Sequence, residues 1–383
     1  MEVVARNLLC AYPELLAHVF KGRISAPRGK VVVESPDQVM WTLARPQEWG
    51  LLIPGRRLNP YFALAEVVWM WSGKGGAEFI TYYNKSIGQF LDQGIPYFNA
   101  AYGKRVRHYG YSELPFRETP FPKTNGQLPE AVEVDQLDHV IRKLQADPDT
   151  RQAAVTLWDP IKDNFHTSKD YPCNNMLYFS QRDGKLNLTV VIRSNDLVWG
   201  TPYNMIQFSH LQALIAGSLE LEIGTYTTMC NNLHVYNDLY PDTRKLVQDW
   251  SNEPHNLYQS SLFNDLPDMR WPLAHFDKFV RTVWERTEKD CRAAQVKYTS
   301  GTHHRSGPHG ADLMVTRHKL HDAFDKHGVP EYWRQLFMTM FLFHVRKAKQ
   351  PKLYEQIVDE FHTLLFWLVK DFNNEFVPES VTV

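Results

Sequence analysis

The sequence holds little cysteine and no long apolar run, and each scarcity excludes a class of protein. Its four cysteines lie far apart and form no CxxC pair, so neither a disulfide framework nor a cysteine-rich zinc site is predicted. The longest apolar runs, at 338–343 and 364–369, are much shorter than the roughly 20 residues that a membrane-spanning helix needs. Residues 1–20 lack the basic start and long apolar core of a signal peptide. We therefore expect a cytoplasmic protein with no membrane partner.

An excess of charge of one sign is also missing. Lys and Arg number 42 against 43 Asp and Glu, which gives a formal net charge of -1 and no general electrostatic attraction to nucleic acid. The chain is 43% hydrophobic and 22% charged, a composition typical of a globular protein with a sizeable core. A small-molecule substrate is the better expectation, and direct nucleic-acid binding is not expected.

The first part of the chain mixes helix and strand signals. Residues 59–72 are mostly apolar after Pro60, which is favoured in the first turn of a helix, and they predict a buried helix. Asp183-Gly184 supplies the positive φ of a tight turn, so the segments beside it predict a β-hairpin. Because strands and helices do not alternate strictly, we predict an α+β sheet domain over residues 1–245. The remaining predicted elements are an amphipathic helix with Leu137, Val140, Ile141 and Leu144 on its apolar face, strands at 153–158, 176–181 and 186–193, and a helix over 205–217.

Residues 246–383 have a different texture, and we predict a mainly helical C-terminal extension packed on the first domain. Apolar residues recur at helical spacing after Val329-Pro330, and again after Pro351, so each stretch predicts a helix. We interpret these stripes as core or subunit-contact surface rather than as a cofactor site. They consist of Trp333, Leu336, Phe337, Met340, Phe341 and His344 in the first helix, and of Leu353, Ile357, Phe361, Leu364, Leu365 and Leu368 in the second.

Polar residues that suit chemistry gather between 171 and 236, where predicted strands end. Cys173 follows Pro172 at the start of the hairpin, where a thiol can be held at a cleft, although a small buried residue is the alternative. Arg193-Ser194 offers a guanidinium fork and a hydroxyl suited to a phosphate, with a surface ion pair and a turn as the alternative. Asn204 can donate to and accept from a base edge, or can cap a helix.

Taken in order, six segments of this sequence resemble the thymidylate synthase family, and most closely its phage deoxypyrimidine hydroxymethylase branch. The resemblance covers about residues 40–240 and is specific, because a cysteine, an RSxDxxxGxPxN string and an HxY pair must coincide. It implies a thymidylate-synthase-like mixed β-sheet with flanking helices, to which the C-terminal helical extension is added. The segments are ALAEVVWMWSG (63–73), AYGKRVR (101–107), DPDTRQ (147–152), PCNN (172–175), RSNDLVWGTPYN (193–204) and HVY (234–236).

The resemblance implies a covalent mechanism. Cys173 matches the nucleophile that adds to C6 of a pyrimidine nucleoside monophosphate, so that C5 can attack the methylene of the co-substrate 5,10-methylenetetrahydrofolate. Glu66 matches the glutamate that manages protons around the base, and Tyr102 matches the tyrosine associated with removal of the C5 proton. Asn204 matches the asparagine that faces the base.

The resemblance also implies the binding residues of a homodimer. Arg193 and Ser194 match a phosphate clamp, to which Arg151 is contributed from the other subunit. Arg28 matches a loop arginine that closes on the phosphate, and Asp196 matches the aspartate that contacts the folate pterin ring. No metal is expected. The implied substrate-binding residues are Arg28, Arg151, Arg193, Ser194, Asn174, Asp196, His234 and Tyr236, the last two at the sugar 3′-hydroxyl, and the implied folate contacts are Asp196, Trp199, Gly200 and Tyr203.

The chain departs from the family pattern around the base. Asn174 stands where typical members have histidine, Gln152 replaces the second of two adjacent arginines, and Ile192 replaces a glutamine. The tryptophan usually found before the YGK motif is missing from the region of 90–92, and the chain continues well beyond Tyr236. Since water exclusion decides whether the exocyclic methylene takes hydride or water, these changes favour a hydroxymethyltransferase over a methylating synthase.

The base choice depends on Asn204. Its amide can donate to O4 and accept from N3–H of uracil, whereas cytosine-specific relatives have an aspartate there, so we predict a dUMP hydroxymethylase. A dCMP or CMP hydroxymethylase is the first alternative and a methylating thymidylate synthase the second. A phage that makes modified DNA is the natural setting by resemblance, which would place the protein in the host cytoplasm, and antibiotic biosynthesis is a second setting.

Two rival readings belong to other classes. A non-catalytic nucleotide- or RNA-binding homologue is disfavoured, because a scaffold has no need of Cys173, Glu66, Tyr102 and Arg193 together. A metal site in residues 302–312, with His303, His304, His309 and Asp312, is disfavoured because adjacent histidines lack the spacing of well-formed zinc sites.

Overall fold

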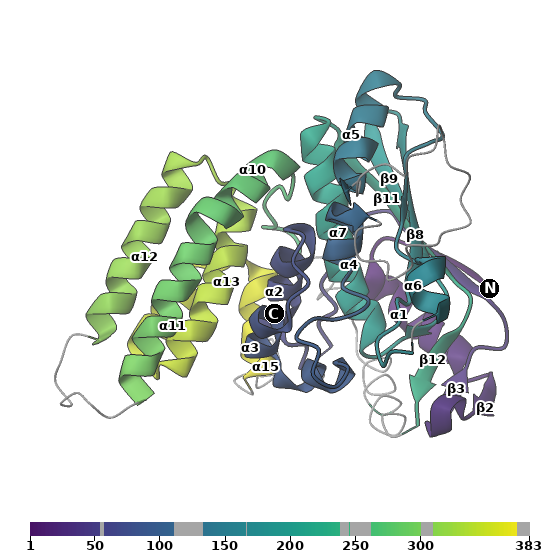
Figure 1. Ribbon diagram of the computed structural model, residues 1–383, viewed down its shortest axis with the longest axis horizontal. Helices are drawn as coiled ribbons and strands as arrows, with labels where there is room; N and C mark the ends of the chain where they lie inside the picture. Colours follow the sequence, from purple (N-terminus) through teal and green to yellow (C-terminus); the bar gives the residue numbers. More distant parts are fainter. Residues whose placement is uncertain are drawn as a thin grey trace, which may run out of the picture.

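The computed structural model describes residues 1–53, 57–110, 133–165, 167–237, 245, 262–299 and 309–373. A sheet-containing part and a block of helices lie side by side, with helix α2 between them (Figure 1). Within the described ranges, no helix is both long enough and apolar enough to cross a bilayer.

The main sheet is mixed, which confirms the predicted α+β class. Two strand pairs run parallel, β1 with β4 and β11 with β9, and the other neighbours run antiparallel. The predicted hairpin turn is present, since Asp183 and Gly184 have φ values of 50° and 73° between β8 and β9. In spatial order the strands are β1 (Glu2–Ala5), β4 (Val39–Leu43), β11 (Glu222–Cys230), β9 (Lys185–Ile192), β8 (Asn174–Arg182) and β7 (Ala154–Thr156).

A smaller sheet arranges the segments that follow the main strands. Asp196 of β10 lies beside His234 of β12 in a parallel pair, and β12 continues antiparallel to β3. Two distant motif segments are thus adjacent. The strand order is β10 (Asn195–Asp196), β12 (Leu233–Tyr236), β3 (Val32–Glu34) and β2 (Arg23–Ser25), and a separate pair is formed by β5 (Tyr109–Gly110) and β6 (Glu133–Val134).

A fully buried helix and a largely buried one form the centre of the molecule. Helix α2 (Pro60–Trp71) begins as predicted, with Asn59 Oδ1 accepting the N–H of Phe62 at its start, and all of its residues are buried. It packs on α7 (Gly200–Ser218), which begins five positions before the predicted 205. The other helices of this part are α1 (Leu8–Val19), α3 (Ala77–Tyr83), α4 (Tyr102–Arg107), α5 (Gln136–Ala146) and α6 (Pro160–Phe165), with short 3₁₀ turns η1 (Pro27–Gly29) and η2 (Lys85–Phe90).

The described residues beyond 272 are helical, as predicted for this region. Helix α13 (Glu331–Lys347) confirms the first aromatic stripe, and its Tyr332, Trp333, Leu336 and Phe337 are all buried. The remaining helices are α10 (Leu273–Phe279), the π-helical turn η4 (Val280–Trp284), α11 (Glu285–Thr299), α12 (His309–Lys326), α14 (Pro351–Val358) and α15 (Thr363–Phe372).

The prediction of one continuous helix over 353–368 is wrong. The segment is broken between α14 and α15, and Phe361 lies outside both. The cause is tertiary, because the backbone N–H of His362 donates to the Gln335 side chain of α13 over 2.8 Å. The His362 imidazole then caps α15 by accepting the N–H of Leu365. These bonds satisfy backbone N–H groups at the start of α15. The hydrophobic periodicity of the sequence does not reveal this second helix start.

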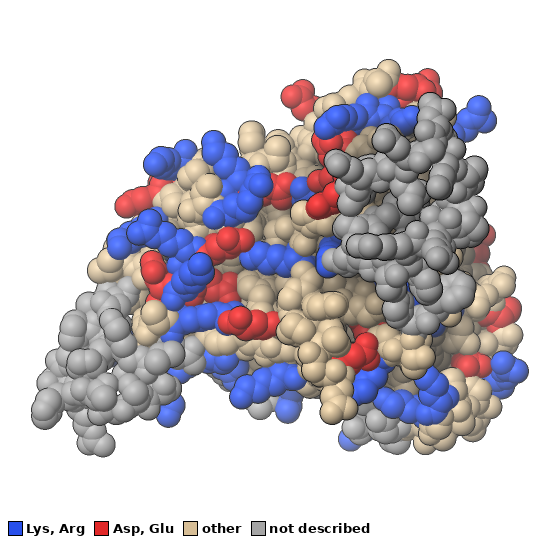
Figure 2. Space-filling view, in the orientation of Figure 1, with Lys and Arg blue, Asp and Glu red and all other residues tan. Residues whose placement is uncertain are grey.

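Polar contacts join the C-terminal helices to the sheet-containing part. Arg107 of α4 forms hydrogen-bonded ion pairs with Asp135 and with Asp277 of α10. In the core, Tyr332 Oη accepts from Trp49 Nε1 and bonds His210 Nε2 of α7, both over 2.7 Å. Basic and acidic side chains alternate over the helices on the face that Figure 2 shows.

Candidate active site

Cys173 lies immediately before β8, at the end of the sheet where the predicted residues meet. Its Sγ is 3.9 Å from Arg193 Nη2, and the Arg193 N–H donates to the Cys173 carbonyl. Burial raises the pKa of the Cys173 thiol, while the charges of Arg193 and of Arg28 oppose this rise. The thiol is therefore half-buried between a cation and the backbone, a setting in which a thiolate is stabilised once it forms.

Tyr102 fixes the segment that carries this thiol. Its Oη lies within 3.0–3.2 Å of three nitrogen donors, namely the backbone N–H groups of Cys173 and Asn174 and the side-chain amide of Asn174. Burial raises the pKa of Tyr102, and the Asn174 and Cys173 donors work against that rise. The hydroxyl therefore keeps its proton at neutral pH, and the three N–H groups hold its oxygen in place beside Cys173.

Asn204, one turn into α7, joins this cluster through its neighbours. Asn174 Nδ2 donates to Asn204 Oδ1, and Asn204 Nδ2 donates to Asn195 Oδ1. Asn195 stands inside the RSND string but was missed as a site residue, because a buried position on a two-residue strand has no periodic signal. The structure thus brings together Cys173, Tyr102, Asn174 and Asn204, as well as the unforeseen Asn195.

Glu66 projects from the buried helix α2 and is 6% exposed. Gln207 Nε2 donates to its Oε2 over 2.9 Å, and Gln207 lies one turn beyond Asn204 on α7. Burial raises the pKa of Glu66 from 4.5 to about 8, against the smaller opposing effect of Gln207. Near neutral pH this carboxyl is mostly protonated and can both give and regain a proton. Gln207 could have been found from its helical i+3 spacing to Asn204.

Arg193 is held with its guanidinium beside the nucleophile. Its Nε donates to the Pro172 carbonyl over 2.9 Å, and the group lies over the Trp158 ring at 5.9 Å. Ser194 is half-buried next to it, and Arg28 is exposed in η1 with a left-handed φ of 52°. Arg28 contributes its charge to the surroundings of Cys173. Three of the predicted phosphate-binding residues, Arg193, Ser194 and Arg28, therefore lie near Cys173.

The predicted folate contacts lie at and just before the N-terminal end of α7. Both carboxylate oxygens of Asp196 accept backbone N–H groups, those of Val198 and Trp199, at 3.0 and 3.1 Å. The Trp199 side chain is 47% exposed, and Tyr203 Oη accepts the N–H of Asn59. At Gly200 a Cβ atom would stand 2.8 Å from Asn195 Oδ1, so a side chain there would disturb the asparagine cluster. An exposed aromatic ring beside a fixed carboxylate suits a flat, polar-edged ring.

His234 and Tyr236 lie two positions apart on β12, so their side chains lie on the same face of the strand. Their rings meet edge to face with centroids 5.3 Å apart, and His234 Nδ1 is 3.1 Å from Asn232 Oδ1. Burial lowers the pKa of His234, so its imidazole is neutral at neutral pH. Lys30 lies over the Tyr236 ring, which ties this strand to the segment that carries Arg28.

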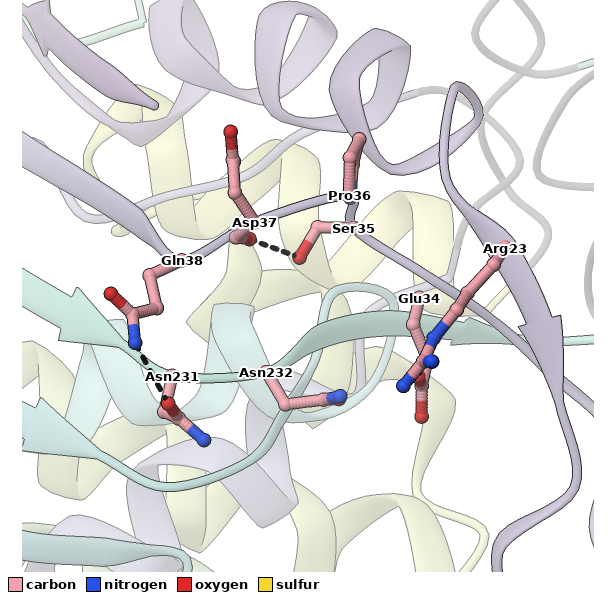
Figure 3. Close-up of a pocket in the computed structure, with 8 residues that line it drawn as sticks. All are labelled: Arg23, Glu34, Ser35, Pro36, Asp37, Gln38, Asn231 and Asn232. Atoms are coloured by element: carbon pink, nitrogen blue, oxygen red, sulfur yellow. Dashed lines mark hydrogen bonds and ion pairs between the residues drawn. The ribbon is translucent and has the colours of Figure 1, made fainter.

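A surface pocket lined in part by Asn232 contains none of the residues of this cluster. Figure 3 shows its polar lining, in which Gln38 bonds Asn231 and Ser35 bonds the Asp37 carbonyl. Most of these side chains satisfy one another, and none of them is a predicted site residue, so we do not assign the chemistry to it. Its lining consists of Arg23, Glu34, Ser35, Pro36, Asp37, Gln38, Asn231 and Asn232.

Arg151 is a predicted site residue that lies apart from the other predicted residues. It is exposed, three positions before the edge strand β7. Within the described ranges, no hydrogen bond or ion pair joins its side chain to the other predicted residues. The side chains of the histidine-rich segment 302–312 lie outside the described residues, and the described residues hold no group of three metal-ligating side chains.

This chain is similar to a family model and to several known proteins. The family model described as thymidylate synthase matches residues 36–269. A deoxyuridylate hydroxymethyltransferase of Bacillus phage SP01 is 40% identical over 233 residues, which cover 60% of this chain and 57% of the relative. One from Pseudomonas phage M6 is 31% identical over 243 residues, covering 62% and 63%. A thymidylate synthase of Bacillus mojavensis is 30% identical over 174 residues, covering 45% and 56%. The chain thus spans less than two thirds of the length of these curated relatives.

Proposed function

Because this chain belongs to the thymidylate synthase family, we propose that it transfers a one-carbon unit from 5,10-methylenetetrahydrofolate to C5 of dUMP and releases 5-hydroxymethyl-dUMP. The observation that carries the proposal is the bonded cluster at the start of β8, where Cys173, Tyr102, Asn174 and Asn204 meet beside Arg193. Two phage relatives named deoxyuridylate hydroxymethyltransferase support the choice of product.

The first step uses the thiol. The Cys173 thiolate adds to C6 of the base, and the electron pair of the C5–C6 bond moves so that C5 attacks the methylene of the folate, whose bond to one of its two nitrogens breaks. Arg193, 3.9 Å from Sγ, stabilises the thiolate before attack and faces the region proposed for the nucleotide phosphate. Folate supplies the carbon; the chain supplies the nucleophile and its orientation.

Proton transfers fall to Tyr102 and Glu66. The Tyr102 hydroxyl takes the proton from C5 while its own O–H proton passes to the folate nitrogen that leaves, so the hydroxyl is neutral before and after the step. Departure of the folate amine leaves an exocyclic methylene at C5. Water then forms a C–O bond to this methylene, its proton goes to the Glu66 carboxylate, and the C6–S bond breaks as the C5–C6 double bond re-forms. A carboxyl with a pKa of about 8 suits this exchange, since both of its forms are populated near neutral pH.

Two polar atoms of the cluster are free to bind a polar edge of a ligand. Asn174 Oδ1 and Asn195 Nδ2 are buried without a hydrogen-bond partner in the part of the chain that the structure describes. Leaving such atoms unpaired is costly, so a polar ligand edge at this place is expected.

We further propose a homodimer in which Arg151 reaches the phosphate of the partner subunit's site, because this exposed residue lies apart from its own cluster.

The test is the mass of the nucleotide formed from 5,10-methylenetetrahydrofolate and an equimolar mixture of dUMP and dCMP. Hydroxymethyl-dUMP is the expected product, and the variant Cys173→Ser serves as the control without nucleophile. Hydroxymethyl-dCMP would keep the chemistry and refute the base assignment. A methyl product formed together with dihydrofolate would refute water capture, and no product from a protein that binds nucleotide would refute catalysis.

A further inference from the structure

Three asparagine side chains form a hydrogen-bonded row beside Cys173. Asn174 Nδ2 donates to Asn204 Oδ1 over 3.3 Å, and Asn204 Nδ2 donates to Asn195 Oδ1 over 3.2 Å. Asn174 Nδ2 also donates to Tyr102 Oη over 3.0 Å. The row, which we call the asparagine row, consists of Asn174, Asn204 and Asn195. Its amides all point in one direction, with each nitrogen facing the oxygen of the next residue.

The two outer members of the asparagine row are rigidly placed. Asn174 is 0% exposed and Asn195 is 2% exposed. The backbone N–H of Asn174 donates to Tyr102 Oη, and that of Asn195 donates to the Asn232 carbonyl, so neither residue can withdraw easily. Asn174 Oδ1 and Asn195 Nδ2 are buried without a partner among the described residues. An acceptor and a donor thus remain beside Asn204 for a ligand edge.

Asn204 alone cannot choose between uracil and cytosine. Uracil presents a donor at N3 and an acceptor at O4, whereas cytosine presents an acceptor at N3 and a donor at its 4-amino group. An amide complements the first edge in one orientation and the second edge after half a turn about its Cβ–Cγ bond. Base choice therefore depends on which of the two orientations the protein enforces.

The asparagine row favours one orientation of the Asn204 amide, and the row is anchored where Asn174 Nδ2 donates to Tyr102 Oη. Turning the Asn204 amide would place its nitrogen against Asn174 Nδ2 and its oxygen against Asn195 Oδ1, which breaks both hydrogen bonds and opposes like atoms. We infer that Asn174 and Asn195 determine base specificity by fixing the orientation of the Asn204 amide. This inference rests on the proposed function, because it concerns the base that the enzyme accepts.

The experiment measures kcat/KM for dUMP and for dCMP and compares their ratio between variants. Asn174→Asp replaces the donor that faces Asn204 Oδ1 by an acceptor, so the Asn204 amide turns and the ratio falls by about tenfold or more. Asn195→Asp keeps an acceptor facing Asn204 Nδ2 and leaves the ratio nearly unchanged. Since both substrates carry the same phosphate, the effect of the added charge on the phosphate cancels in the ratio, and Asn195→Asp carries the same added charge beside the base as Asn174→Asp.

Asn187→Asp is the matched control. Its Oδ1 accepts the N–H of Thr225 over 2.8 Å on the hairpin strand β9, so the same chemical change keeps its contact and leaves the ratio unchanged. If Asn174→Asp does not fold, Asn195→Leu replaces it. Leucine has the same number and branching of side-chain heavy atoms and cannot accept, so Asn204 loses one of its two restraints and the ratio falls by about threefold or more.

Each outcome decides the matter. A folded Asn174→Asp variant with an unchanged ratio overturns the inference, and so does an unchanged ratio in Asn195→Leu. A ratio that falls in Asn195→Asp but not in Asn174→Asp shows that the row runs in the opposite direction and overturns the assignment. Calorimetric titration of the wild-type protein with dUMP separates failure of the proposed function from failure of the inference about base specificity. Absence of nucleotide binding overturns the proposed function and the inference with it, whereas binding with a ratio that no variant moves overturns the inference alone.

Discussion

Lowering the pH from neutral to about 5 should destabilise this protein, because three histidines are buried in their uncharged form. Burial lowers the pKa of His210 and of His344 from 6.5 to about 3, and that of His362 to about 4. Counting these three histidines alone, the unfolded chain binds about three more protons than the folded chain at about pH 5. Stability gained from these groups is complete above the unfolded pKa and is lost as the pH falls.

Glu66 acts in the opposite direction. Its folded pKa of about 8 lies above the ordinary 4.5, so its contribution is complete at low pH and is lost as the pH rises towards 8. Between about pH 5 and 6 the four groups together leave a difference of two protons. At about 1.4 kcal/mol per proton and pH unit, the free energy of unfolding should fall by roughly 2–3 kcal/mol per unit.

Urea unfolding at a series of fixed pH values, followed by tryptophan fluorescence, measures this slope. The variant His344→Gln removes one of the three groups, so its slope should be smaller by about 1.4 kcal/mol per pH unit whatever its absolute stability. The reasoning is refuted if the wild-type free energy stays flat between about pH 6 and 5, or if the variant keeps the full wild-type slope.

Three further predictions concern single side chains. Cys173→Ser should abolish turnover while the melting temperature stays close to that of the wild type, which differential scanning calorimetry checks; substantial residual turnover would refute the covalent step. Glu66→Gln should lower kcat and remove the inflection near pH 8 from the pH profile of kcat, and a profile that keeps this inflection would assign it to another group. Tyr332→Phe should cost roughly 2–5 kcal/mol in urea unfolding, because it leaves Trp49 Nε1 and His210 Nε2 buried and unpaired. The exposed Tyr178→Phe is its control, and equal effects of the two changes would contradict the argument.

Local patterns in the sequence were sufficient where one short segment determines its own shape. The Asp183-Gly184 turn follows from the positive φ that these residues tolerate, and the helix at 59–72 follows from Pro60 and an unbroken apolar run. The break between α14 and α15 could not be predicted in this way. It depends on the bond from His362 to Gln335, and only the folded chain brings these two residues together.

The candidate site shows the same division. Cys173, Tyr102 and Asn204 stand in recognisable motifs, and the structure places them in one bonded cluster. Asn195 was missed although it lies within such a motif, because its significance comes from its contact with a helix that begins five residues later. Motif spacing along the chain identifies candidate site residues. The hydrogen bonds between them, and the direction of each bond, are known only when the folded chain brings the partners together.

The position of α2 at the centre of the molecule has a consequence for how this protein can be divided. One side of α2 packs on α7, and other sides pack on α13 and α15 (Figure 1). A chain that stopped at residue 245 would leave the apolar residues of α2 facing water, on the helix that carries Glu66. Exposed apolar surface of that kind promotes aggregation. The C-terminal helices are therefore better regarded as one half of a shared folding unit, which gene fusion or recombination could exchange only together with the helix they cover.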